Sequence, residues 1–307
     1  MTDAGHSDLL ASSLSSNVLD GRRLAESIQQ RTAEKAKALR DAGHPLRLVA
    51  VLCGEPPGAL VYAERQQERA REVGIDYRLQ RMPAGSTFEQ IKARIDELNQ
   101  SRAVTGIMLH LPLPAGIDAT KLQGRIHQAK DVEGVAPASI GRVVYGRTLL
   151  APCTARAAVE LVQASGVPLK GAEAVVVGAS EIVGKPVALL LTQRGATVTI
   201  CQKFTRDLTS HTSRADILVV AAGVPGLIGA DQVKDGACVI DVGINRVAGE
   251  DGKTRTVGDV DFAAVQQKAG HITPVPGGVG PMTVAMLLAN TVEAAELAAR
   301  ASDGNSL

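Results

Sequence analysis

The chain has 307 residues, of which 45% are apolar and 21% charged, a composition typical of a soluble globular protein of about two domains. A net charge of +1 provides no basic surface for nucleic acid or for anionic membranes, and an aromatic content of 2% without Trp leaves no platform for base stacking. We therefore expect neither a nucleic-acid partner nor a membrane partner.

The cysteines and the N-terminus indicate the compartment. No two cysteines form a CxxC pair, and their positions are Cys53, Cys153, Cys201 and Cys238. Free cysteines in apolar runs are typical of a reducing compartment. The first residues lack the basic-then-apolar order of a signal peptide, and no apolar run reaches the about 18 residues of a membrane span. We expect a cytoplasmic protein without a metal site.

After a Ser-rich tail over residues 1–16, the first half of the chain alternates between helical and strand patterns. Apolar spacing predicts three helices and two buried strands, which are helices 22–39, 60–73 and 87–99 and strands 47–52 and 106–109. Two prolines directly after the last strand end it. Such alternation is typical of a parallel sheet covered by helices.

A second alternating series begins near residues 149–154. It comprises four strands and two helices, namely strands 174–177, 197–201, 216–221 and 238–242 and helices 183–194 and 283–299. We expect an α/β fold with two domains, 1–150 and 151–282, and a C-terminal helix over 283–300 that packs back on the first. The last residues, 301–307, are expected to form a loose tail.

The turn after strand 174–177 has the features of a dinucleotide site. Gly178 permits a tight turn, Gly184 permits close approach of the backbone, and Pro186 suits the first helical turn. Unpaired N–H groups at this helix N-terminus would face a phosphate. Because position 180 is Ser, the turn departs from G-x-G-x-x-G, and a structural turn without a ligand stays open as an alternative.

The following strand indicates which dinucleotide is bound. In Rossmann-type sites an acid at this strand's end binds the ribose 2′-hydroxyl, whereas a basic residue accommodates a 2′-phosphate. Here Lys203 and Arg206 precede any acid, since the first is Asp207. This pattern favours NADP over NAD, unless the two bases are ordinary solvated loop charges.

Several motifs carry a resemblance to a known family. They are Gly178-x-Ser180-x-x-Val183-Gly184-x-Pro186, Asp241-Val242-Gly243-Ile244-Asn245 and the run from Thr273 to Thr283, accompanied by Asp20-Gly21, Leu111-Pro112-Leu113-Pro114, Lys130-Asp131-Val132, Pro152-Cys153-Thr154 and Gly258-Asp259-Val260-Asp261. Over about residues 18–297, the sequence resembles the methylenetetrahydrofolate dehydrogenase/methenyltetrahydrofolate cyclohydrolase family.

The resemblance implies an N-terminal catalytic domain with folate in the cleft, a Rossmann-type domain with NADP, and usually a homodimer. Such enzymes move a hydride from the methylene carbon to NADP, and many then hydrolyse the methenyl product. Residues expected to bind the substrate are Tyr62, Glu133, Pro276, Gly277, Gly278 and Pro281. Those expected to bind the cofactor are Gly178, Ser180, Val183, Gly184, Lys203, Thr205, Arg206, Gly223, Gly243, Ile244 and Thr283.

The glycine pair near the C-terminal helix can also be interpreted from its residues alone, without the resemblance. Gly277 and Gly278 between two prolines make a rigid turn whose backbone can approach a flat ligand closely. Val275-Pro276 is a candidate cis peptide bond. A purely structural turn is the alternative.

The expected catalytic residues depart from the family pattern. Tyr62 matches Tyr-x-x-x-Lys, but Gln66 stands at the Lys position, which is central to the cyclohydrolase. His110 stands where the family has Gln, and Glu133 where it has the Asp that grips the pterin ring. The alternatives are a solvated helix face for Gln66, a structural histidine, and a loop charge beside Lys130. On the cofactor side, the family's Arg is replaced and its His-Ser pair is Gln202-Lys203.

These departures leave four hypotheses open. Gln66 cannot carry a proton or a charge, so hydrolysis is threatened more than hydride transfer. The first hypothesis is therefore an NADP-dependent dehydrogenase with weak or no cyclohydrolase activity. The second is a bifunctional enzyme in which His110 replaces the missing Lys, since a histidine suits acid–base work. The third is a non-catalytic binding relative, and the fourth an enzyme for another pterin carrier.

Overall fold

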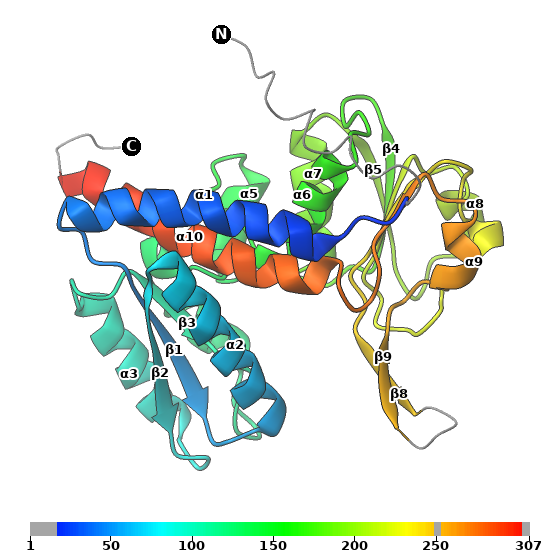
Figure 1. The fold of residues 1–307 in the computed structure, drawn as a ribbon. Helices are drawn as coiled ribbons and strands as arrows, with labels where there is room; N and C mark the ends of the chain where they lie inside the picture. Colours follow the sequence, from blue (N-terminus) through cyan, green and yellow to red (C-terminus); the bar gives the residue numbers. More distant parts are fainter. Residues whose placement is uncertain (1–16, 249–252, 303–307) are drawn as a thin grey trace, which may run out of the picture.

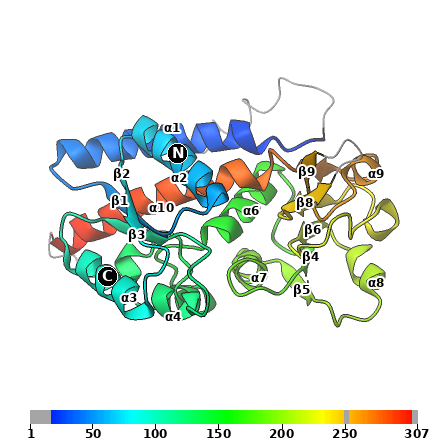
Figure 2. The ribbon, with the colours of Figure 1, turned by 90° about the horizontal axis from the view of Figure 1, so that it is seen from below.

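A computed structural model describes residues 17–248 and 253–302 (Figure 1). The tail expected over 1–16 lies outside the described residues, as do residues 303–307 of the tail expected over 301–307, whereas residues 301 and 302 belong to a helix and not to a tail. Two parallel sheets stand side by side, and two long helices, α1 (Gly21–Asp41) and α10 (Val279–Ser302), run across the molecule and connect them (Figures 1 and 2). The expected two-part α/β fold is therefore confirmed.

The first sheet has the strand order β2-β1-β3, with β2 at Asp76–Met82, β1 at Arg47–Cys53 and β3 at Gly106–Leu109. Helices α2 (Pro57–Val73) and α3 (Phe88–Gln100) connect these strands. The sequence did not predict β2. Its residues alternate only partly between buried and exposed, because it is an edge strand paired on one side.

The second sheet is parallel and has the order β10-β7-β6-β4-β5. Its strands are β4 (Glu173–Val177), β5 (Thr197–Cys201), β6 (Ile217–Val220), β7 (Cys238–Asp241) and β10 (His271–Ile272). The chain order reverses between β4 and β6, and in open parallel sheets ligands bind beyond the strand ends at such a switch point. Alternate β4 residues face opposite layers. Ala174 and Val176 pack with α6 (Cys153–Ala164) and α7 (Gly184–Gln193), and Val175 and Val177 pack on the other face.

The remaining elements are short or surround these sheets. The helices are α4 (Ala119–Gln123), α5 (Pro137–Val144), α6 (Cys153–Ala164), α7 (Gly184–Gln193), α8 (Leu208–Thr212) and α9 (Phe262–Gln266), with 3-10 turns at Gln128–Lys130 and Ala230–Gln232. The antiparallel hairpin of β8 (Asn245–Ala248) and β9 (Thr254–Val257) projects from the second sheet (Figure 1). The sequence did not predict this hairpin, or α4, α5 and α6.

Helix α10 packs back on the first sheet, as expected, but begins four residues before the predicted start. Met286 packs in the core of the second sheet, and Leu288 in that of the first. By length and composition alone, Val279–Ala301 could cross a membrane, although polar and charged residues interrupt its apolar run. Within that helix the most apolar window is 61% buried in the protein, because α10 packs between α1 and α6, and this packing identifies a core helix.

Candidate active site

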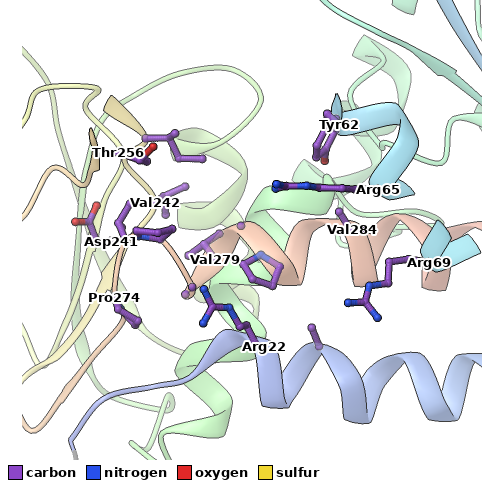
Figure 3. Close-up of a pocket in the computed structure, with 18 of the residues that line it drawn as sticks. Arg22, Tyr62, Arg65, Arg69, Asp241, Val242, Thr256, Pro274, Val279 and Val284 are labelled. Atoms are coloured by element: carbon purple, nitrogen blue, oxygen red, sulfur yellow. The ribbon is translucent and has the colours of Figure 1, made fainter. Parts of the chain in front are cut away.

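A cavity of about 540 Å³ opens between the two sheets, bounded by α1, α2 and the start of α10 (Figure 3). Tyr62 lines it from α2, and the segment 276–281 lines it from the opposite side. Of the six residues expected to bind the substrate, Tyr62, Pro276, Gly277, Gly278 and Pro281 therefore meet around one cavity. The end of β7 and the residues that follow it, 241–244, complete its wall on the side of the second sheet.

The glycine loop is held tightly against the start of α1. Gly277 has a φ of 119°, and the Val275-Pro276 peptide bond is cis, as predicted. A Cβ atom at Gly278 would lie 2.6 Å from the Thr273 Cβ atom, and one at Gly21 would lie 1.8 Å from the Gly278 carbonyl oxygen. Larger residues are excluded at these two positions, so the loop presents bare backbone to the cavity.

Three arginine side chains point toward this cavity: Arg22 from α1, and Arg65 and Arg69 from α2 (Figure 3). Arg69 forms an ion pair with Glu72 at 2.8 Å, whereas Arg22 and Arg65 have no ion-pair partner within residues 17–248 and 253–302. Two acidic residues, Glu26 and Glu68, also line the cavity. The two unpaired guanidinium groups are available to an anionic ligand.

Behind Tyr62 lies a buried cluster of polar side chains. Gln66 is 0% exposed, so it is not on a solvated helix face. Its amide nitrogen donates to the Met108 sulfur at 3.5 Å, and its oxygen accepts a hydrogen bond from the Tyr77 hydroxyl at 3.0 Å. The Tyr77 oxygen lies 3.2 Å from Nε2 of His110. The sequence did not predict a role for Tyr77, because the polar pattern of β2 did not predict the strand that carries it.

His110 is neutral in this setting. Burial lowers the pKa of its imidazole to about 4, and the described residues place no carboxylate against the ring to oppose this effect. The ring stands edge-on to Tyr62 with 6.3 Å between the ring centroids. A histidine with this pKa cannot act as a general acid near pH 7, because it holds no second proton there.

Glu133 lies beside this cluster. Its Oε2 accepts a hydrogen bond from the Leu109 backbone N–H at 3.4 Å. Burial raises the pKa of its carboxyl to about 8, and the charge of Asp131 adds to the effect. Lys130 does not neutralise it, because the Lys130 ammonium donates to backbone carbonyls, among them that of Ser101 at 2.7 Å. Glu133 is therefore mainly protonated at neutral pH.

A second polar network supports the segment that leads to Glu133. The Asn290 amide donates to the carbonyls of Val132 at 2.8 Å and Ala151 at 2.9 Å. Arg156 donates to Asn290 and, through both guanidinium nitrogens, to the Glu293 carboxylate at 2.7 Å. These positions lie more than 130 residues apart in the sequence, so only the packing of α6 on α10 reveals their connection.

The expected phosphate-binding turn follows β4. A Cβ atom at Gly178 would lie 2.1 Å from the Ala221 carbonyl oxygen, and one at Gly184 would lie 1.9 Å from the Gly178 carbonyl oxygen, so both positions require glycine. One expectation was wrong: the first helical N–H groups are not unpaired. Gly184 donates to the Ser180 hydroxyl at 3.3 Å and Lys185 to the Ser180 carbonyl at 3.0 Å. The loop N–H groups of 179–183, by contrast, have no acceptor among the described residues.

The basic residues follow the neighbouring strand. The Gly178 N–H donates to the Cys201 carbonyl at 2.9 Å, which places the two loops side by side. Lys203 and Arg206 are exposed, and the Thr205 hydroxyl accepts from the Gln202 N–H at 2.8 Å. Val183 forms the N-cap of α7, and Gly223, at the end of β6, has a φ of 69° and donates its N–H to Asp259 at 2.8 Å.

Other expected cofactor residues lie nearer to the cavity. Gly243 and the exposed Ile244 line it. The Thr283 hydroxyl donates to the Gly280 carbonyl at 2.7 Å in the first turn of α10. The resemblance-derived set thus extends from the Gly178 turn to the rim of the cavity. That span suits a long dinucleotide whose reacting end meets a second ligand.

The two motifs around Asp241 and Asp259 have a structural role. Asp241 is buried and accepts N–H groups of Gly243, Asp259 and Val260 at 2.9–3.0 Å. Asp259 accepts the N–H groups of residues 222 and 223. The paired acids therefore hold the segments that follow β6 and β7 of the second sheet against the segment that follows β9.

Comparison with known proteins identifies the family. Residues 19–133 match the catalytic domain of tetrahydrofolate dehydrogenase/cyclohydrolase, and residues 152–299 match its NAD(P)-binding domain. The chain is 50% identical to a Mesorhizobium japonicum protein named bifunctional protein FolD 2, covering 91% of each chain. It is 49% identical to the bifunctional protein FolD of Bordetella petrii, covering 91% of this chain and 94% of that protein.

Solved structures agree with these matches. The bifunctional methylenetetrahydrofolate dehydrogenase/cyclohydrolase of Campylobacter jejuni superposes with a TM-score of 0.87 at 41% identity, covering 91% of this chain and 98% of that one. The Trypanosoma brucei dehydrogenase-cyclohydrolase, solved with NADP and an inhibitor, gives 0.86 at 37% identity, covering 92% and 98%. The chain belongs to the tetrahydrofolate dehydrogenase/cyclohydrolase family.

Proposed function

We propose that this protein is an NADP-dependent 5,10-methylenetetrahydrofolate dehydrogenase of one-carbon metabolism whose cyclohydrolase activity is strongly depressed. The observation that carries the proposal is the cavity shared by the two sheets. Tyr62 and the bare Gly277 loop face each other across it, and Gly243 and Ile244 bring the rim of the dinucleotide site to the same place. This arrangement suits the meeting of a flat substrate with a nicotinamide ring.

The chain's own residues orient the two ligands. The Tyr62 ring and the Gly277 backbone form the walls against which the pterin would lie. Glu133, protonated near pH 7, can both donate and accept a hydrogen bond at the polar edge of that ring. Hydride transfer requires mainly this orientation.

The dinucleotide site fits NADP. The N–H groups of 179–183 without protein acceptors suit a pyrophosphate, and Gly178 and Gly184 let the backbone come close. Lys203 and Arg206, on the adjacent loop, would hold a 2′-phosphate in place of the family's Arg, whose position is Ala179 here. The bound cofactor would supply the hydride acceptor.

Hydrolysis of the methenyl product needs proton handling, and the buried cluster offers little of it. Gln66 has no titratable group, and His110 is a weak base with a pKa of about 4. Loss of a general acid–base group typically slows the affected step by about 10²–10⁴-fold. The hypothesis that His110 replaces the missing Lys is therefore disfavoured on physical grounds.

A bifunctional enzyme is the second candidate, and one observation favours it. The pKa of Glu133, about 8, lies close to neutral pH, where a general acid–base group is most effective. If hydrolysis is rapid, Glu133 rather than His110 is the expected proton carrier. Glu133→Gln would then abolish hydrolysis more completely than hydride transfer.

The arginines of the cavity give the substrate a charged anchor. Folates carry a glutamyl tail, and unpaired guanidinium groups bind carboxylates well. We propose that Arg22 and Arg65 hold this tail while Tyr62 holds the ring system. Glu26 and Glu68 limit the site to a few carboxylates, because they reduce the positive potential of the same wall.

Turnover tests the proposed activity. Purified protein with methylenetetrahydrofolate and NADP should form reduced nicotinamide, and Tyr62→Ala should slow this strongly. Tyr145→Ala is the matched control, since Tyr145 is 81% exposed and away from the cavity, and it should leave the rate unchanged. A protein that binds both ligands but forms no reduced nicotinamide would instead be a non-catalytic relative.

We also propose a division of the chain into a folate-binding domain, 1–150, and a dinucleotide-binding domain, 151–282, with helix 283–300 returning to the first. The separate sheets and the family matches support this division. A homodimer and a cytoplasmic location complete the proposal. The four free cysteines support the cytoplasmic location, because unpaired thiols are typical of a reducing compartment.

A further inference from the structure

Three buried side chains from three elements form one hydrogen-bonded chain next to the cavity. Gln66 comes from α2, Tyr77 from β2 and His110 from the end of β3, and their exposures are 0%, 4% and 3%. The links measure 3.0 Å between the Gln66 oxygen and the Tyr77 hydroxyl, and 3.2 Å between that hydroxyl and His110 Nε2. Each hydrogen in such a chain can be assigned from the donors available.

The orientation of the Gln66 amide is the first step. Its nitrogen faces the sulfur of Met108 at 3.5 Å, and a thioether can only accept a hydrogen bond. The Gln66 oxygen must therefore face Tyr77. A carbonyl oxygen only accepts, so the single hydroxyl hydrogen of Tyr77 points at Gln66.

The protonation of His110 follows from this. With its hydrogen committed to Gln66, the Tyr77 oxygen can only accept in its contact with His110. Nε2 of His110 must then carry the hydrogen. Because a neutral imidazole has one N–H, Nδ1 is left as an unprotonated acceptor.

The unprotonated Nδ1 belongs to a ring that is 3% exposed and lies behind Tyr62, next to the cavity rather than on its lining. It has no hydrogen-bond partner in the described part of the chain. It is also absent from the polar side-chain atoms that are sealed from solvent there without a partner, namely those of Thr148, His211 and Thr212. Tyr62, which lines the cavity, stands edge-on to the same ring.

We propose that Tyr77 is a positioning residue, which through Gln66 fixes the Nε2–H tautomer of His110 and so presents Nδ1 as a hydrogen-bond acceptor to the ligand in the cleft. The ligand chemistry that matches is an N–H donor, such as the amino and ring N–H groups of a pterin. This last identification rests on the proposed function. The tautomer itself does not.

The ¹⁵N resonances of the His110 ring test the proposal in full-length protein labelled with ¹⁵N-histidine. The signal is assigned among the six histidines by its loss in His110→Gln. At pH 7 the unmutated protein should show a protonated Nε2 and an unprotonated Nδ1. A protonated Nδ1 would overturn the proposal.

Two variants separate positioning from mere packing. In Gln66→Met the Tyr77 hydroxyl loses its acceptor and can donate only to His110, so the ring should switch to the Nδ1–H tautomer. In Tyr77→Phe the ring has lost the hydroxyl that bonds to Nε2, so neither tautomer is favoured and both should be populated. Tyr145→Phe, an exposed control, should change nothing.

An unchanged His110 tautomer in Gln66→Met would contradict the proposed hydrogen-bonded chain from Gln66 through Tyr77 to His110, even if Tyr77→Phe failed to fold. The measurement requires no turnover, so it decides the proposal independently of the enzymatic activity. If the protein were inactive toward methylenetetrahydrofolate but showed the expected tautomers, the proposed function would be contradicted and the proposed role of Tyr77 would stand.

Discussion

The Glu133 carboxyl has a pKa of about 8, against about 4.3 for an unperturbed glutamate. Between these values the folded protein keeps a proton that the unfolded chain releases. Stability from this group is therefore complete below about pH 4 and is lost as the pH rises through 8, with a slope of roughly 1.4 kcal/mol per pH unit.

Glu133→Gln should remove this pH dependence, because the amide keeps the acceptor for the Leu109 N–H and carries no charge. Urea unfolding at pH 5–9 measures it. Relative to the unmutated protein, Glu133→Gln should gain free energy of unfolding as the pH rises. The free energy of unfolding of Glu64→Gln, an exposed change on α2, should follow the same pH dependence as that of the unmutated protein. Parallel curves for Glu133→Gln would show that Glu133 is charged throughout.

Lys203 determines the cofactor preference in this account. A hydrogen bond to a charged group contributes about 1.5–3 kcal/mol, so Lys203→Ala should weaken NADP binding by about tenfold or more. NAD, which lacks the 2′-phosphate, is the internal control and should bind unchanged. Fluorescence or calorimetric titration of the unmutated protein that gives equal affinities for NAD and NADP would contradict the assignment.

The site was predictable from the sequence where short segments carry it. Tyr62 and Gly277 stand in motifs whose backbone requirements can be read directly, and the structure places them on one cavity. Tyr77 could not be found, because its role depends on the pairing of β2 with β1 and on the distant His110. Burial, which makes His110 neutral and Glu133 protonated, depends on packing that no local pattern records.

At the scale of elements, an ion pair joins α6 to α10 beside their shared apolar core. Arg156 and Glu293 are bonded through two nitrogens, and their side chains are 23% and 29% exposed. Arg156→Met leaves Glu293 without its partner, and breaking a largely buried pair costs about 3 kcal/mol. A thermal or urea unfolding measurement should show this loss.

Lys35→Met is the matched control for that variant. Lys35 of α1 forms an ion pair with Glu296 of α10, the helix that also carries Glu293, but the lysine side chain is 56% exposed. Exposed pairs contribute about 0–1 kcal/mol, so this variant should be nearly as stable as the unmutated protein. Equal losses in the two variants would show that the α6–α10 pair has no special role.

Elements with a strong apolar pattern were predicted close to their observed bounds, as for β3 and β5. Among the elements that were missed, helix α6 has a clear apolar face, but the strands have weaker patterns. β2 is an edge strand with polar residues at alternate positions, and β8 and β9 form a projecting hairpin with mainly exposed residues. Helix α10 begins earlier than predicted because it includes Val279 and Gly280, which a propensity argument assigns to the glycine loop.

At the scale of the whole molecule, the family resemblance leads us to expect a closed twofold dimer, the commonest assembly among soluble oligomers. Sedimentation at micromolar concentration should give a species of twice the 31.9 kDa chain mass. A single species of 31.9 kDa under those conditions would exclude the dimer.

The central claim is that the cavity supports hydride transfer while the neutral cluster of Gln66 and His110 depresses hydrolysis. The most direct test follows reduced nicotinamide and the methenyl product separately, with the unmutated protein, methylenetetrahydrofolate and NADP. The account predicts that reduced nicotinamide forms and methenyltetrahydrofolate accumulates, with hydrolysis about 10²–10⁴-fold slower than a proton-handling site would allow. Hydrolysis that keeps pace with hydride transfer would contradict it.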